Sequence, residues 1–351
     1  MEYGYCEFLL HQIAFYKDGI RPCCSFSIKG DTTPFVNNYD GNIEGIKQYL
    51  QKREKFINIF KSGKKPVCYY NCTTYIPSVF GDDNNETLFQ LNNIIISNYT
   101  KCSCNCIYCE QSAFGQNQEY KKWLNSRECY DVKPVLLYLR ENNYIRKNCC
   151  FLICGGECSE YPKGELEWLI YFAKLCEGKL LILSSGIRYS QAIEKALKTS
   201  DTILKISVDS GTKSTYEKIK RVKAYDITWS NIKRYINAVR TTQNCNSNIE
   251  LKYIVIPGIN DNIKEVNAFL NKCQEVNCTT IVLDVEHQWI QENKNNPDKH
   301  KTLKEIFNYF FRFMYSSSTP EIHMSFEGVE EDWLWSLVEE KYNYKKVKNE
   351  I

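Results

Sequence analysis

From about residue 90 onward, short apolar runs rich in β-branched residues alternate with longer amphipathic stretches. This alternation predicts repeated βα units around a parallel sheet. Strands of such a sheet are buried on both faces and are apolar throughout, whereas each crossover helix buries only one of its faces and is amphipathic. The predicted strands are NNIIIS (92–97), CCFLICG (149–155), KLLILSS (179–185), ILKISVD (203–209), ELKYIVI (250–256) and TTIVLDV (279–285). Predicted helices between them include 132–143, 164–177, 231–242 and 263–276.

The six βα units predict an α/β fold. Successive right-handed crossovers curve a parallel sheet, and six units rather than eight give a partial (βα)6 TIM-like barrel, open on one side. We assign this barrel to residues 89–290, a small cysteine-rich domain to residues 1–88, and a C-terminal helical extension to residues 291–351. Loops that follow the barrel strands are where such folds place their chemistry.

The composition of the chain limits the kinds of binding partner to expect. The 351 residues are 43% apolar and 25% charged, with a formal charge of +3, so bulk charge indicates neither nucleic acid nor an anionic membrane. MEYGYCEFLL lacks the features of a signal peptide, and no apolar run approaches the roughly 20 residues of a membrane span. We therefore expect a cytoplasmic protein, in which 18 cysteines indicate metal or cluster ligation rather than disulfides.

The segment KCSCNCIYCE (101–110) directly follows the first predicted strand. Cys102, Cys106 and Cys109 form a C-x3-C-x2-C pattern, and three thiolates from one loop can ligate three irons of a cubane cluster while the fourth stays open. A structural zinc site prefers paired C-x2-C knuckles, but Cys104 is available as a fourth ligand, so zinc remains an alternative.

With Tyr108 in its aromatic position, this loop resembles that of the radical S-adenosylmethionine (SAM) superfamily, and the resemblance extends over residues 92–286. It implies a catalytic 4Fe-4S cluster on Cys102, Cys106 and Cys109, with SAM as the second cofactor. An electron from the cluster would cleave SAM to methionine and a 5′-deoxyadenosyl radical, which abstracts a hydrogen atom from a substrate. The protein supplies geometry and excludes water and oxygen.

The same resemblance implies further SAM contacts at the ends of later strands. The GGE at 155–157 would bind the methionine amino group of SAM. Its paired glycines let the backbone approach a ligand closely, and the glutamate carboxylate accepts hydrogen bonds from an ammonium. Ser207 and Asp209 fall on one strand face at period two. Ser207 and Asp209 would reach the ribose or the methionine end of SAM, Lys220 or alternatively Arg221 its carboxylate, and Ile256 and Gly258 its adenine. The other implied contacts are Tyr108, Gly155, Gly156, Glu157 and Ser185.

The first 88 residues contain two more cysteine patterns, C-x12-G-x4-C and CYYNC (68–72). IAFYKDGIRPCC (13–24) predicts a β-hairpin with Asp-Gly at its turn. The patterns resemble the SPASM or twitch extensions of radical SAM enzymes, which implies an auxiliary 4Fe-4S cluster. Its implied ligands are Cys6, Cys24, Cys68 and Cys72, with Cys23 as the alternative to Cys24; a zinc knuckle or buried thiols remain open.

Two other places carry candidate chemistry. Cys154 and Cys158 flank GGE, and one of them is a candidate hydrogen donor. DVEHQW ends the sixth strand and places Glu286, His287 and Trp289 near the barrel mouth; His287 is either a substrate-binding or acid-base group or a structural histidine.

The leading function is a radical SAM enzyme that modifies a peptide by epimerisation, cross-linking or dehydrogenation, with flavodoxin or ferredoxin as the electron donor. A carbohydrate or small-molecule substrate is the first alternative. A zinc-stabilised binding module is a remote alternative, because the sequence has no basic stripe with interleaved aromatic residues. A protein that only transfers electrons would have no use for the GGE segment.

Overall fold

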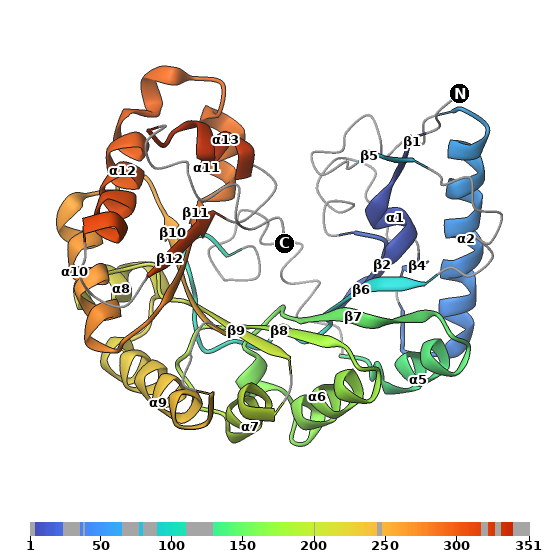
Figure 1. Ribbon diagram of the computed structural model, residues 1–351. Helices are drawn as coiled ribbons and strands as arrows, with labels where there is room; N and C mark the ends of the chain where they lie inside the picture. The colour runs from blue at the N-terminus through green and yellow to red at the C-terminus, as the bar shows by residue number, and fades with distance from the viewer. Residues whose placement is uncertain are drawn as a thin grey trace. The chain divides into compact units, whose positions relative to one another are not determined.

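The computed structural model describes residues 4–23, 36–37, 39–64, 77–79, 90–109, 129–199, 201–243, 248–316, 322–326 and 331–339. The chain divides into two compact units, which are described separately. Unit one comprises Met1–Cys102, Asn117–Ile182 and Ser200–Thr202, and unit two comprises Ser103–Gln116, Leu183–Thr199 and Ile203–Ile351. From Leu91 onward, successive strands are separated by helices along the chain (Figure 1).

Unit one contains the first strands and helices of the chain. Its strands are β1 (Gly4–Cys6), β2 (Gln12–Tyr16), β3 (Gly19–Arg21), β4 (Val36–Asn37), β5 (Pro77–Val79), β6 (Leu91–Ser97), β7 (Ile145–Ile153) and most of β8 (Lys179–Ser184). Its helices are α1 (Glu7–His11), α2 (Ile43–Lys61), α5 (Lys133–Glu141), the short 3-10 helix η2 (Cys158–Glu160) and α6 (Glu165–Leu175).

The main sheet of unit one has the order β8-β7-β6-β2-β3-β4. The pairs β2–β6, β6–β7 and β7–β8 are parallel, whereas β2–β3 and β3–β4 are antiparallel. The predicted hairpin is therefore confirmed, although its two turn residues are Lys17 and Asp18, and Gly19 is the first residue of β3, opposite Tyr16. The sequence did not reveal that β2 pairs with β6, because nothing local to β2 specifies its neighbour in a sheet.

Unit two contains the later βα units and the C-terminal elements. Its strands are β9 (Thr202–Ser207), β10 (Ile249–Val255), β11 (Thr280–Val285) and β12 (His323–Phe326). Its helices are α7 (Gln191–Thr199), α8 (Lys213–Lys220), α9 (Tyr225–Gln243), α10 (Ile263–Glu275), α11 (His287–Asn293), the short 3-10 helix η3 (Pro297–Lys299), α12 (Lys301–Ser316) and α13 (Glu331–Ser336). The strand order is β12-β11-β10-β9, and all three pairs are parallel.

The six predicted strands and the predicted α/β class are confirmed, and the ends of the strands differ from prediction by four residues at most. β12 adds a parallel strand after the six, within the predicted C-terminal extension. Among the described residues, the helices are not long and apolar enough to cross a membrane. The predicted domain boundaries stay predictions.

Side-chain caps and one close backbone approach position the helices of unit two. Asn262 caps α10 by accepting from Glu265 N, and Thr212 caps α8 by accepting from Thr215 N. A Cβ atom on Gly211 would lie 2.0 Å from Glu265 O, so only glycine allows α10 to pack this closely against the turn after β9. This turn carries Asp209 into the candidate site.

Candidate active site

The cysteine loop follows β6. Its residues up to Cys102 belong to unit one, and those from Ser103 onward belong to unit two. The part in unit two is attached to the last turn of α8. Asn105 N donates to Lys220 O and Ile107 N donates to Ile219 O, both at 3.0 Å. These backbone hydrogen bonds fix the conformation of this part of the loop independently of its side chains.

The loop thiols differ in exposure. Cys102 is exposed, whereas Cys104, Cys106 and Cys109 are partly exposed. The pKa of Cys106 is lowered to about 6, chiefly by a hydrogen bond with Cys104, with burial acting against it and Lys220 in its favour. Among the described residues, no three His, Cys, Asp or Glu side chains are gathered as the ligands of a metal ion. Three accessible thiols in one loop nevertheless fit the ligand chemistry of a 4Fe-4S cluster.

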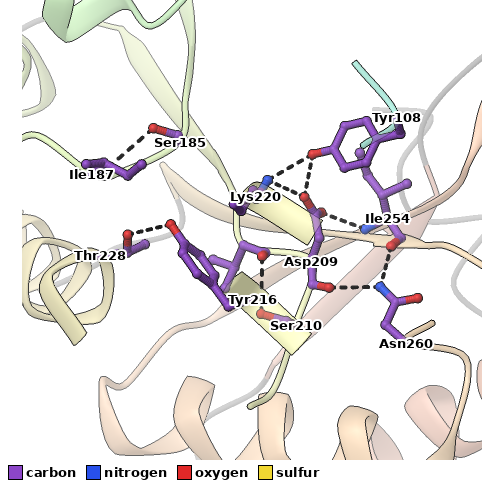
Figure 2. A network of polar contacts seen from close by, with 11 residues as sticks. Tyr108, Ser185, Ile187, Asp209, Ser210, Tyr216, Lys220, Thr228, Ile254 and Asn260 are labelled. Atoms are coloured by element: carbon purple, nitrogen blue, oxygen red, sulfur yellow. Dashed lines mark hydrogen bonds and ion pairs between the residues drawn. The ribbon is translucent and has the colours of Figure 1, made fainter. Parts of the chain in front are cut away.

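A buried polar network lies beside the loop (Figure 2). Tyr108 donates its hydroxyl hydrogen to Asp209 Oδ2 at 2.6 Å, and Lys220 Nζ donates to the Tyr108 hydroxyl at 2.8 Å. Lys220 also forms an ion pair with Asp209 Oδ2, and the two side chains are 1% and 0% exposed. The second carboxylate oxygen, Oδ1, accepts from Ile254 N at 2.9 Å. The network therefore joins the cysteine loop, the turn after β9, α8 and β10.

Electrostatics keep Lys220 and Tyr108 of this network in fixed protonation states. Burial acts to lower the pKa of Lys220, but Asp209, followed by Tyr108, outweighs it and raises that pKa well above its usual value. Burial, followed by the Asp209 carboxylate, raises the pKa of Tyr108 well above its usual value. At neutral pH the network is thus an ammonium and a carboxylate joined by a neutral phenol.

This geometry corrects one expectation about Asp209. β9 ends at Ser207, and Asp209 has a left-handed backbone with φ of +61°, so the two-residue alternation predicted for this strand does not reach it. The structure places Lys220 on Asp209, although the sequence predicted separate roles for them at SAM. Arg221, the alternative to Lys220, ends α8 with φ of +55°.

Asn260 organises the segment that follows β10 and was not singled out by the sequence. Its side-chain nitrogen donates to Asp209 O at 2.8 Å and to Ile254 O at 2.7 Å, and its oxygen accepts from Ile256 N at 2.6 Å. Ile256 is buried, whereas Gly258 has φ of +81° and no atom within 4 Å of an added Cβ. Gly258 is therefore exposed, and its backbone N–H donates to Asp261 Oδ1 at 2.8 Å. An asparagine between two loop residues gives no periodic signal by which to find it.

The GGE segment of unit one lies against the start of the cysteine loop. Gly156 N donates to Tyr99 O at 2.7 Å, and Glu157 N donates to Lys101 O at 2.8 Å. An added Cβ would lie 2.2 Å from Lys101 O at Gly156 and 2.6 Å from Tyr99 O at Gly155. Both distances are below the 3.0 Å that real Cβ contacts respect, so packing alone requires the two glycines.

The Glu157 side chain is buried and oriented by the turn that it begins. Its Oε1 accepts from Ser159 N at 3.2 Å and from the Ser159 hydroxyl at 2.7 Å, which makes it the N-cap of η2. The Cys158 thiol lies 3.7 Å from the same oxygen and is 1% exposed, whereas Cys154 is partly exposed. A carboxylate held in this way has a defined orientation toward any ligand.

The remaining predicted residues occupy separate places. Ser185 and Ser207 are partly exposed, and Ser185 accepts a long hydrogen bond of 3.4 Å from Ile187 N. Glu286 caps α11 by accepting from Gln288 N and Trp289 N, and His287 is exposed with a hydrogen bond to Gln291. Of the predicted auxiliary ligands, Cys6 and the alternative Cys23 are buried in unit one; Cys24, Cys68 and Cys72 lie outside the described residues.

One curated protein shares limited similarity with this chain. A GTPase Obg of Brachyspira hyodysenteriae is 26% identical over 200 residues, which cover 55% of this chain and 27% of that protein. This identity and coverage show no family. The sequence also contains no G-x4-G-K-[ST] segment, whose backbone amides and lysine bind phosphates in P-loop proteins.

Solved structures give a likeness in fold. SuiB of Streptococcus suis, bound to precursor peptide SuiA, matches with a TM-score of 0.51 and 14% identity, over 83% of this chain and 56% of that chain. A structure of anSMEcpe with bound AdoMet matches with a TM-score of 0.48 and 16% identity, over 66% of this chain and 61% of that chain. This chain therefore spans about half the length of SuiB.

A family model matches the region that contains the site. The model of the radical SAM superfamily matches residues 96–270, from the end of β6 into α10. This range includes the cysteine loop, GGE, the Asp209–Lys220 network and the segment around Asn260. The match implies a 4Fe-4S cluster and SAM as cofactors and an α/β fold of the partial-barrel type. The chain belongs to the radical SAM superfamily.

Proposed function

We propose that this enzyme reductively cleaves SAM at a 4Fe-4S cluster held by Cys102, Cys106 and Cys109, and that it abstracts a hydrogen atom from a peptide substrate. When bound, the reduced cluster supplies the electron that splits SAM into methionine and a 5′-deoxyadenosyl radical. The observation that carries the proposal is the three-thiol loop within the matched radical SAM region, in which Lys101 is hydrogen-bonded to GGE and Asn105 and Ile107 are hydrogen-bonded to α8.

Residues from each unit are candidates to bind and orient SAM. Gly155, Gly156 and Glu157 suit the methionine amino group, because the glycines let backbone approach and the Glu157 carboxylate has a fixed orientation. Ile256 and Gly258 suit the adenine, since one is apolar and the other exposes its backbone. Further candidate contacts are the hydroxyls of Ser185 and Ser207 and the ring of Tyr108.

We assign Asp209 and Lys220 a role different from direct SAM binding. The Lys220 ammonium already has two oxygen partners, and binding a SAM carboxylate would require it to exchange one of them. Leaving a buried carboxylate without its cation is strongly unfavourable. We therefore infer that the pair positions Tyr108 and the neighbouring loop thiols.

The test compares single cysteine variants after anaerobic reconstitution. Cys102→Ala, Cys106→Ala and Cys109→Ala should each abolish release of 5′-deoxyadenosine from SAM under a strong reductant. Cys104→Ala is the matched control from the same loop and should retain both iron and turnover. Retained deoxyadenosine release in the three variants, or zinc in place of iron in the wild type, would overturn the proposal.

An auxiliary 4Fe-4S cluster on Cys6, Cys24, Cys68 and Cys72 is part of this proposal. Replacement of Cys68 and Cys72 should remove about four irons per chain and leave SAM binding intact. Separate Cys23→Ala and Cys24→Ala variants would decide between these adjacent thiols. Unchanged iron content in the double variant would refute the auxiliary cluster.

A peptide is the leading substrate because SuiB, whose fold this chain shares, was solved with a precursor peptide. The face of β9–β11 that carries Lys252 is charged: Lys252 pairs with Asp284 at 2.8 Å, and Lys205 pairs with Glu250 at 3.2 Å. Packed barrels fill their interior with branched apolar side chains, so these charges favour a polar substrate. They suit a carbohydrate or another polar small molecule as well, which is the second candidate.

Substrate class is testable by isotope transfer. Peptides and sugars with deuterium at carbon would be incubated with the reduced enzyme, SAM and flavodoxin or ferredoxin as electron donor. Deuterium in 5′-deoxyadenosine identifies the molecule that loses the hydrogen atom. Transfer from sugars and from no peptide would replace the peptide proposal with the carbohydrate one.

A further inference from the structure

The β2–β3 hairpin places the charged side chain of Arg21 on one face of the sheet of unit one. Ala14 pairs with Ile95 on one side and with Arg21 on the other, so the three side chains share a face. Leu152 pairs with Ile95 in the same row and is only partly buried. On the opposite face Phe15 is fully buried, as Ala14 is on this one. Arg21 therefore lies on the face that also carries the partly exposed Leu152.

The turn of the hairpin contains a buried lysine for which the described residues provide no ion-pair partner. Lys17 is 7% exposed, a value that lysines rarely reach unless they are paired. Within the described residues, its ammonium has one polar partner, the Thr100 hydroxyl at 3.4 Å. A neutral hydroxyl at this distance compensates little of the hydration that a buried ammonium loses.

The neighbouring charges do not neutralise Lys17. Asp18, 4% exposed, forms an ion pair with Arg21, which is also 4% exposed and lies over the Tyr16 ring at 4.5 Å. Arg21 Nε is buried and, in the described part of the chain, has no hydrogen-bond partner. Two cations and one carboxylate leave the hairpin with one uncompensated positive charge and one unused buried donor.

This positive site is attached to the segment that leads into the cysteine loop. β2 runs parallel to β6, and Tyr16 lies opposite Ser97, so the hairpin turn is at the carboxyl end of β6. Tyr130 forms hydrogen bonds with both β2 and the residue that follows β6. Its hydroxyl donates to Tyr16 O at 2.8 Å, and its carbonyl accepts from Asn98 Nδ2 at 2.7 Å. The turn and its charges therefore reach the residues that directly precede Cys102.

We propose that Lys17 and Arg21 form a subsite for an oxyanion, a carboxylate or a phosphate, carried by the substrate of the radical reaction. The inference rests on the proposed function and adds to it the charge of the group that is recognised. A buried cation whose charge is not balanced by a nearby anion destabilises the ligand-free protein, and an anionic ligand that enters the subsite removes this penalty. Arg21 Nε supplies a directed hydrogen bond beside the point charge of Lys17.

The first test measures the stability of the ligand-free protein. Lys17→Met replaces an uncompensated cation by an apolar side chain of similar length, so the melting temperature should rise. Lys133→Met is the matched control in the same unit, because Lys133 pairs at 2.6 Å with Glu165, whose side chain is 5% exposed. That variant should melt at a lower temperature. An equal fall in both variants would give Lys17 an ordinary structural role and overturn the subsite.

The second test uses acetate and inorganic phosphate as probes, each compared with chloride at equal ionic strength. A ligand that binds only the native state raises the melting temperature, so at least one probe should do so in the wild type and not in Lys17→Met. A response to acetate alone assigns a carboxylate, and a response to phosphate alone assigns a phosphate. Identical melting in both probes and in chloride would overturn the proposal.

SAM also carries a carboxylate, and its affinity separates the two sources. If the anion belongs to the substrate, Lys17→Met binds SAM within about twofold of the wild type. A loss of about tenfold or more would assign the subsite to SAM and overturn the proposal. Release of 5′-deoxyadenosine by the wild type tests the proposed function separately. Its absence would refute radical chemistry and leave the melting experiments interpretable.

Discussion

Lys220→Met tests the buried network beside the cysteine loop. The substitution leaves the Asp209 carboxylate, which is 0% exposed, with the Tyr108 hydroxyl and Ile254 N as its remaining hydrogen-bond donors among the described residues. Removal of one member of a buried ion pair costs about 3–5 kcal/mol, and the two surviving hydrogen bonds place the expected loss toward the lower end. At about 2–4 °C per kcal/mol for a domain of this size, the melting temperature should fall by roughly 6–20 °C.

The assay is anaerobic thermal unfolding of the reconstituted protein, with iron content measured on the same samples. Lys213→Met is the matched control, because Lys213 on the same helix pairs with Asp226 at 2.6 Å but both side chains are largely exposed. It should produce no measurable change, since surface pairs contribute little. In the double variant Lys220→Met with Asp209→Asn, the carboxylate is removed as well, and part of the lost stability should return.

The pH dependence of this difference has a defined sign. Asp209 raises the pKa of Lys220 in the folded protein against the effect of burial, so the stabilisation is present in full below the unfolded value of about 10.4 and is lost only above it. The wild type and Lys220→Met should therefore differ equally at all pH values from neutral to about 9. Equal melting of Lys220→Met and Lys213→Met would refute the reasoning.

Three further substitutions test other parts of the site. Gly156→Ala places a Cβ 2.2 Å from a backbone oxygen of the cysteine loop and should lower both iron content and melting temperature. Gly164→Ala meets no atom within 4 Å and should cost only the backbone strain of its positive φ, about 1–2 kcal/mol; equal losses would contradict this. Asn260→Ala removes three buried hydrogen bonds and should destabilise by roughly 2–4 kcal/mol in thermal unfolding, clearly more than the exposed Asn142→Ala. Burial acts to raise the pKa of Glu265, but hydrogen bonds from two threonine hydroxyls and the backbone lower that pKa overall. The stabilisation of the folded protein by the ionised Glu265 is therefore present above the unfolded pKa of about 4.3, and it is lost as pH falls through the lower folded pKa. The stability difference between the wild type and Glu265→Gln should therefore shrink in acid, and a constant difference from neutral pH downward would be inconsistent with that pKa.

Local sequence was sufficient for the features that depend on short-range chemistry. The β-branched runs predicted all six strands, because residues of this type fit a pleated and buried surface wherever they occur. Asp18 and Gly19 predicted a hairpin turn for the same kind of local reason. The spacing of Cys102, Cys106 and Cys109 identified the family, since ligands from one loop are close in sequence by necessity.

Tertiary structure alone decided which distant groups meet. The sequence placed Asp209 and Lys220 at SAM as separate contacts, whereas the fold pairs them and adds Tyr108, because a buried charge must find its partner wherever the chain brings one. Asn260 gained its role from three backbone groups that only the folded loop brings together. The pairing of β2 with β6, which brings Lys17 to the approach to the cysteine loop, also depends on hydrogen bonds between segments far apart in the chain. No local pattern encodes such pairings, because backbone donors and acceptors are the same in every strand.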